Sequence, residues 1–140
     1  MTRIVEKVRL LEKSDALWEK IGRFGAVGEW HPMLFRVRSE GEREGSLRTA
    51  EARDGTRRTE RLIEAAPRRR SYRYRMEKSV MPVHDYIAEF RVHDNRDGTS
   101  TVIWLAQFEP IGDEGHTAEG VRRFLKAGLD NLERIYGKAA

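Results

Sequence analysis

The strongest candidate for a reactive group in this chain is the carboxylate of Glu60. Glu60 shares a predicted strand face with Leu62, because alternate residues of a strand point to the same side. A carboxylate that faces an apolar cavity is desolvated and holds its proton more tightly, which suits a general acid or base near neutral pH. The alternative is a carboxylate at the rim of the sheet, paired with Arg48 or Arg58. The sequence leaves both interpretations open.

Aromatic side chains with polar groups form the second set of candidates. Tyr74 and Tyr86 lie on faces predicted to point inward, where a phenol can donate a hydrogen bond to a ligand carbonyl or simply anchor the core. Trp30 and Trp104 could stack on a flat ligand, although both would serve equally well as core residues. In a reaction, Glu60 and Tyr86 would be the catalytic residues.

The sequence gives no indication of a metal site or of a reactive thiol. The chain has no cysteine, which excludes disulfides, thiol catalysis and cysteine zinc sites. His31 precedes Pro32 and either titrates near neutral pH or shapes the turn. His84 and its neighbour Asp85 should point to opposite faces of a strand, so they are not expected to form a His–Asp dyad. No histidine pair has a spacing typical of metal ligands. We therefore expect no metal and no cofactor.

One concentrated basic run, residues 68–75, interleaves arginines with Tyr72 and Tyr74. Single-stranded nucleic acids bind where aromatic and cationic side chains share one exposed face. Strand alternation instead places these tyrosines opposite Arg73 and Arg75. The run therefore favours a strand with a buried aromatic side and a solvated cationic side, and it argues against a nucleic-acid partner.

The elements that would position these residues follow from periodicity and turn signals. A first strand is expected at 3–11, with short helical segments beginning at Ser14-Asp15 and covering Phe24–Trp30. Pro32 ends the second segment. Turn signals then divide Leu34–Glu109 into six strands. In the strand predicted at 83–93, the side chains expected to point into the protein are His84 and every second residue after it. The pattern predicts an antiparallel meander of seven strands.

A long amphipathic helix, Val121–Tyr136, closes the chain. Its apolar stripe can pack on the concave face of the sheet, and a curled sheet would then enclose a cavity. Gly128 falls on that stripe, where glycine costs about 1 kcal/mol relative to alanine. It either leaves room for a ligand or lets a large residue such as Trp104 approach the helix. The stripe consists of Val121, Phe124, Leu125, Leu129, Leu132 and Tyr136.

In order along nearly the whole chain, several segments resemble the polyketide cyclase/START-like superfamily (SRPBCC, or helix-grip proteins), in particular its small bacterial branch. They are residues 24–32, 45–49, 54–55, 60–62, 72–74, 81–86, 101–104 and the terminal helix. The resemblance implies a seven-stranded antiparallel sheet that grips a C-terminal helix around an apolar pocket. Members bind lipids, hormones or polyketides, and some catalyse cyclisation or dehydration. By position, the lining residues would be Trp30, Glu60, Tyr74, Tyr86, Trp104, Phe124, Leu125 and Leu129.

The composition fits one α+β domain covering residues 1–140, with 39% hydrophobic and 36% charged residues and a net charge of +4. No apolar run reaches the ~20 residues of a membrane span, and the N-terminus does not resemble a signal peptide, so a cytoplasmic protein is expected. It is expected to be a monomer or a homodimer. The primary hypothesis is binding of a small, largely apolar metabolite between sheet and helix. The alternative is a cyclase/dehydratase in which Glu60 acts as acid/base and Tyr86 or Tyr74 stabilises an enolate oxygen.

Overall fold

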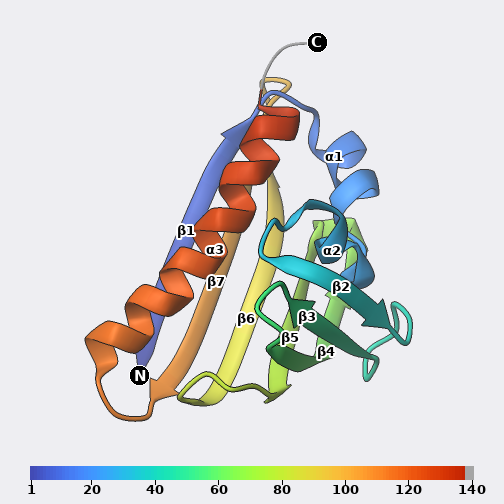
Figure 1. The fold of residues 1–140 in the computed structure, drawn as a ribbon. Coiled ribbons are helices and arrows are strands. Elements are labelled where there is room, and N and C mark those ends of the chain that lie inside the picture. The colour runs from blue at the N-terminus through green and yellow to red at the C-terminus, as the bar shows by residue number, and fades with distance from the viewer. Residues whose placement is uncertain (138–140) are drawn as a thin grey trace.

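The structure, a computed structural model, describes residues 1–137 and consists of one antiparallel sheet, a long C-terminal helix and short helices after the first strand (Figure 1). Among residues 1–137, none of the helices combines the length and the hydrophobicity of a membrane-spanning segment. The strands are β1 (Thr2–Leu10), β2 (Leu34–Ser39), β3 (Leu47–Ala52), β4 (Arg57–Ala66), β5 (Ser71–Lys78), β6 (Val83–Asp94) and β7 (Ser100–Pro110). The helices are α1 (Ser14–Ile21), α2 (Val27–Trp30) and α3 (Glu114–Tyr136), with 3-10 turns at Phe24–Ala26 and Pro67–Arg69.

The seven strands form a sheet in the order β1-β7-β6-β5-β4-β3-β2, and every neighbouring pair is antiparallel. Strands β2 to β7 are consecutive neighbours, as predicted. The first strand departs from a simple meander, because α1 and α2 carry the chain across to the far edge and β1 pairs with β7 instead of β2. The predicted fold class is confirmed: an α+β helix-grip arrangement with seven antiparallel strands and two short helices after strand 1.

Helix α3 lies along β1 and β7 (Figure 1) and begins seven residues earlier than its periodicity predicted. The Asp113 side chain caps it by accepting a hydrogen bond from the His116 backbone N–H at 3.1 Å. Gly115 and Gly120 weaken the helical pattern of the first turns, which explains the missed start. The predicted stripe is buried from Val121 to Leu132.

Strand β6 shows the expected alternation only from Tyr86 onward. Tyr86, Ala88 and Phe90 are buried, whereas His84 is exposed, so its predicted inward orientation is wrong. Asp85 has a positive φ of 51°, and the pairing with β7 shifts register between His84 and Ile87. This irregularity turns the start of the strand and reverses the face on which His84 lies.

Candidate functional site

The residues predicted to line a ligand cavity are all buried, and they pack against one another. Trp104 is fully buried, and its indole Nε1–H donates to the Tyr74 hydroxyl at 3.0 Å. The Trp30 ring stacks on Phe90 with 5.3 Å between ring centroids, while its Nε1–H has no acceptor among residues 1–137. Tyr86 stacks on Phe108. These contacts make the centre of the protein an aromatic core.

Gly128 explains how helix α3 comes so close to this core. A Cβ atom at Gly128 would lie 2.7 Å from His31 Cδ2, 2.9 Å from Trp30 Cζ3 and 3.0 Å from Trp104 Cζ3. The first two separations are shorter than the contacts that Cβ atoms make in proteins, and the third is tighter than most of them. Of the two roles predicted for this glycine, the structure shows close approach of large side chains.

Glu60 forms a buried ion pair with Arg48. The two residues lie opposite each other in the β3–β4 register, and each is only 2% exposed. Arg48 Nε donates to Glu60 Oε1 at 2.8 Å, and Arg58 Nη1 lies 3.9 Å from the other carboxylate oxygen. The pairing with Arg48 that the sequence left open is therefore present, deep in the protein and away from the rim.

Aromatic rings enclose the Arg48 guanidinium. Its Cζ lies 4.2 Å from the ring centroid of Phe24 and 4.5 Å from that of Tyr74, and its Nη1 donates to the Phe24 carbonyl at 2.7 Å. Burial alone would lower the pKa of Arg48, but the Glu60 carboxylate together with the phenols of Tyr72 and Tyr74 outweighs that effect and raises it. Arg48 stays charged, and Glu60 supplies the compensating negative charge.

The phenols of Tyr74 and Tyr86 remain protonated. Burial raises the pKa of both tyrosines, and the nearby Glu60 carboxylate raises it further. Each phenol can therefore act as a neutral hydrogen-bonding group. Neither can act as a base at neutral pH.

His31 connects α2 to α3 as a neutral imidazole. Its Nε2–H donates to the Phe124 carbonyl at 2.8 Å, and its Nδ1 accepts from the Met33 backbone N–H at 3.2 Å. Desolvation lowers the pKa of His31 to about 4, and the charges of Arg58 and Arg48 contribute. Both nitrogens are engaged, so this histidine fixes the position of α3.

A pocket of about 290 Å³ lies between the sheet and the N-terminal half of α3. We call it the helix–hairpin pocket, because the β3–β4 hairpin, the β5–β6 loop and α3 form its walls. Its lining is mainly apolar. The lining residues are Met33, Leu34, Ala50, Ala52, Asp54, Thr56, Arg57, Arg58, Ser79, Val80, Met81, Pro82, His116, Thr117, Gly120 and Phe124.

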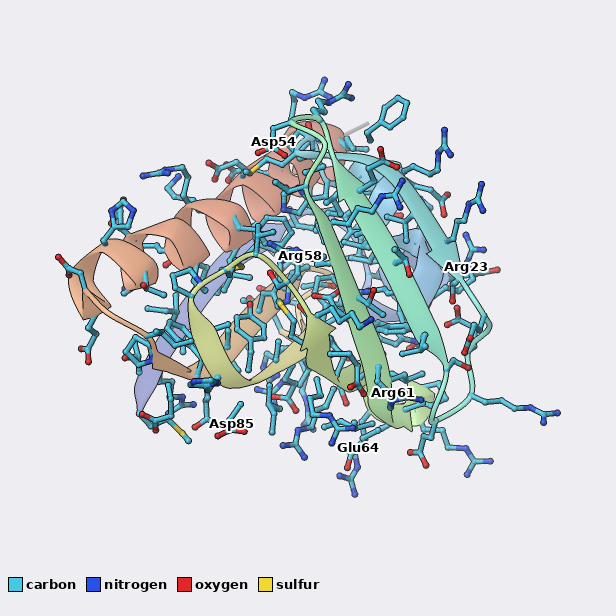
Figure 2. All side chains as sticks on the ribbon, turned by 60° about the horizontal axis from the view of Figure 1, so that its bottom comes forward. Arg23, Asp54, Arg58, Arg61, Glu64 and Asp85 are labelled. Atoms are coloured by element: carbon cyan, nitrogen blue, oxygen red, sulfur yellow. The ribbon has the colours of Figure 1, made fainter. Side chains whose placement is uncertain are left out.

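Arg58 and Phe124 join this pocket to the buried ion pair. Figure 2 shows Arg58 near the end of β4 that follows the turn at Asp54, with Arg61 and Glu64 farther along the same strand. The Arg58 guanidinium lies 3.9 Å from the Phe124 ring centroid, and the His31 ring stacks on Phe124 at 4.1 Å. Two groups this close to one centroid must occupy opposite faces, so Phe124 is held between a cation and a neutral imidazole.

Of the predicted lining residues, Phe124 is the one that borders the helix–hairpin pocket. From the sequence, Arg58 was predicted only as a partner for Glu60, and Met33, Val80 and Met81 were not predicted as ligand-lining residues. The signal for Arg58 was present, since period-two alternation from Glu60 and Leu62 places Arg58 on the same inner face.

A second hollow of about 400 Å³ lies between α1 and the β4–β5 end of the sheet, and Trp18, Phe24 and Tyr72 are among its lining residues. It has no sequence-predicted ligand residue. Within residues 1–137, no group of three or more histidine, aspartate or glutamate side chains is placed to hold a metal ion.

Comparison with known proteins agrees with this architecture. A crystal structure of an uncharacterized protein from Bacillus thuringiensis superimposes with a TM-score of 0.88 at 23% identity, covering 96% of this chain and 98% of that chain. XoxI from Bacillus cereus gives a TM-score of 0.89 at 24% identity, covering 97% and 96%. Norcoclaurine synthase from Thalictrum flavum, in complex with dopamine and hydroxybenzaldehyde, gives 0.75 at 14% identity, covering 96% and 85%. At these identities the similarity establishes the fold.

The sequence itself identifies the family. No curated protein sequence matches the chain. The family model described as polyketide cyclase / dehydrase and lipid transport matches residues 1–137, which is nearly the whole chain. The protein therefore belongs to the polyketide cyclase/dehydrase and lipid transport family.

Proposed function

We propose that the protein binds a small, largely apolar molecule in the helix–hairpin pocket. The observation that carries this proposal is a mainly apolar pocket, open between the sheet and α3, with one charged side chain at its inner end. Its volume of about 290 Å³ is at the lower end of the roughly 300–1,000 Å³ typical of ligand pockets. The processes that name the family, polyketide cyclisation, dehydration and lipid transport, all involve largely apolar molecules.

Apolar residues at the rim support access from solvent. Val80 is 73% exposed and Met33 is 39% exposed, and both border the pocket. Large exposed hydrophobic side chains beside an apolar pocket can contact a ligand that projects from it. Dopamine and hydroxybenzaldehyde, bound by norcoclaurine synthase, are small aromatic molecules, which is the ligand size that this pocket suits.

The geometry favours binding over the cyclase/dehydratase alternative. That reaction needs the Glu60 carboxylate at the reacting carbon, whereas Glu60 is 2% exposed and does not border the pocket. Its Oε1 already accepts a hydrogen bond from Arg48. Proton uptake by Glu60 would also leave the buried Arg48 guanidinium without its counter-charge.

The proposal is tested by an NMR titration of the ¹⁵N-labelled protein with 2-naphthamide, an uncharged bicyclic aromatic probe. We expect saturable shifts in the amide signals of Ala52, Val80 and Gly120, which border the helix–hairpin pocket. Ala52→Trp should fill this pocket and abolish binding. Its matched control, Ala65→Trp, places the same side chain at the second hollow and should leave binding intact. Shifts confined to the second hollow, or no saturable shifts, would contradict the proposal.

A further inference from the structure

We propose that the ligand of the helix–hairpin pocket carries one anionic oxygen group, a carboxylate or its equivalent, which pairs with Arg58. This inference rests on the binding function proposed above and names the chemical class of the ligand. It follows from the charge balance of the buried groups, from the free hydrogen-bond donors of Arg58 and from the positions of the other charges around the pocket.

The buried charges do not balance. Arg48, Glu60 and Arg58 form one cluster with two positive charges and one negative charge, so the cluster has a net charge of +1. Glu60 Oε1 is 2.8 Å from Arg48 Nε, whereas Glu60 Oε2 is 3.9 Å from Arg58 Nη1, which is too long for a hydrogen bond. Glu60 therefore neutralises Arg48, and the unpaired charge of the cluster lies on Arg58.

The hydrogen-bond donors of Arg58 are also largely unused. A guanidinium has five N–H donors. Within residues 1–137, the hydrogen bond formed by this side chain goes from Nη2 to the Met81 thioether sulfur at 3.3 Å, and thioether sulfur is a weak acceptor. The Nη1 atom is buried and has no acceptor in the described chain. Phe124 supports one face of the guanidinium, and Arg58 borders the pocket, so an anionic oxygen in the pocket can approach the donors that Glu60 and Met81 leave unused.

Apart from the Glu60 carboxylate at 3.9 Å, no carboxylate among the pocket-lining residues pairs with Arg58. Asp54 borders the pocket, but it is exposed at the hairpin tip and accepts hydrogen bonds from the Thr56 N–H at 3.0 Å and the Thr56 hydroxyl at 2.7 Å. Arg57 is exposed and lies nearest to Glu51, at 3.9 Å. His116 is exposed at the start of α3. The other ionisable groups around the pocket thus leave Arg58 without a counter-ion.

Burial makes this unpaired cation a strong recognition element. The Arg58 side chain is only 14% exposed, so little water can compensate its charge. In such surroundings an ion pair and its hydrogen bonds are stronger than they would be in water. An apolar molecule with one carboxylate would place its hydrocarbon part against the pocket walls and its charge on Arg58.

The test compares 2-naphthoate with 2-naphthamide, which have the same shape and differ in charge, by isothermal titration calorimetry at pH 7. Charge-assisted hydrogen bonds should make 2-naphthoate bind about 10- to 100-fold more tightly to the parent protein. Arg58→Met should abolish that preference and still bind 2-naphthamide, which also shows that the variant is folded. Arg58→Lys should keep part of the preference, because it retains the charge and loses the planar fork.

Arg91→Met is the matched control, because Arg91 is exposed on β6, outside the pocket, and the substitution removes the same charge. It should keep the full preference for 2-naphthoate. Equal affinity of the parent for both probes, or an unchanged preference in Arg58→Met, would overturn the assignment of Arg58 while leaving the pocket intact. Binding of neither probe to the parent would instead overturn the proposed binding function, and this inference with it.

Discussion

Replacement of Glu60 by glutamine tests whether this carboxylate has a structural or a chemical role. The substitution keeps an oxygen that can accept from Arg48 but removes the negative charge opposite a fully buried guanidinium. Removal of one partner of a buried ion pair typically costs about 3–5 kcal/mol. Because the hydrogen bond can persist, we expect the lower end, a loss of about 3 kcal/mol in the free energy of unfolding. For a domain of this size that corresponds to a fall of roughly 10 °C in Tm.

The assay is urea unfolding at pH 7, followed by circular dichroism, with Glu77→Gln as the matched control. Glu77 accepts hydrogen bonds from Arg61 and Arg75, but on the exposed surface, so its replacement should have a much smaller effect. The double variant Arg48→Met/Glu60→Leu should lose less stability than the two single changes added together, because it leaves neither charge unpaired.

A loss of less than about 1 kcal/mol in Glu60→Gln would refute this reasoning, since a buried Arg48 charge left without its partner should cost more than that. A structural role and an acid/base role of Glu60 also predict different effects on stability, ligand binding and turnover. A structural Glu60 predicts a less stable variant that still binds 2-naphthamide. An acid/base Glu60 predicts unchanged stability and lost turnover.

Two further predictions concern His31 and Gly128. The pKa of His31 falls from 6.5 to about 4 on folding, so the stability that its neutral form provides is complete above pH 6.5. As the pH falls toward 4, about 3 kcal/mol of the free energy of unfolding should be lost. Urea unfolding at several pH values between 4 and 8 should show this loss, and His31→Gln should lack it. Gly128→Ala should destabilise the protein by about 1–3 kcal/mol in thermal unfolding, because its Cβ would collide with Trp30, His31 and Trp104. Gly120→Ala in the same helix is the control. Its Cβ meets no atom within 4 Å, so this variant should be as stable as the parent or more stable.

Much of the fold could be predicted from local patterns. Period-two alternation correctly identified the inward face of β6 from Tyr86 onward and that of β7, which includes Trp104. A period of 3.6 residues identified the buried stripe of α3. These patterns work because each face repeats within one element. They failed at His84 and at the start of α3, where a left-handed residue and glycine-rich turns interrupt the repeat.

The candidate site was less accessible to sequence reasoning, because it depends on contacts between distant segments. Alternation placed Glu60 on an inner face, but only the β3–β4 pairing set Arg48 opposite it and made the two a buried ion pair. His31 could have titrated or shaped a turn. Burial keeps it neutral, and its hydrogen bond to the Phe124 carbonyl, 93 residues away, ties it to α3.

Patterns along the chain were enough to indicate which faces are apolar, how many strands form and which family the chain resembles, since these properties are local or spread along the whole chain. Those patterns could not indicate how the helix packs on the sheet, which fills the centre of the sheet with aromatic rings and leaves open space beside Arg58. Whether an apolar face borders a cavity or a packed core depends on how closely the helix approaches the sheet. In this protein the absence of a side chain at Gly128 allows the helix to lie this close to Trp30, His31 and Trp104.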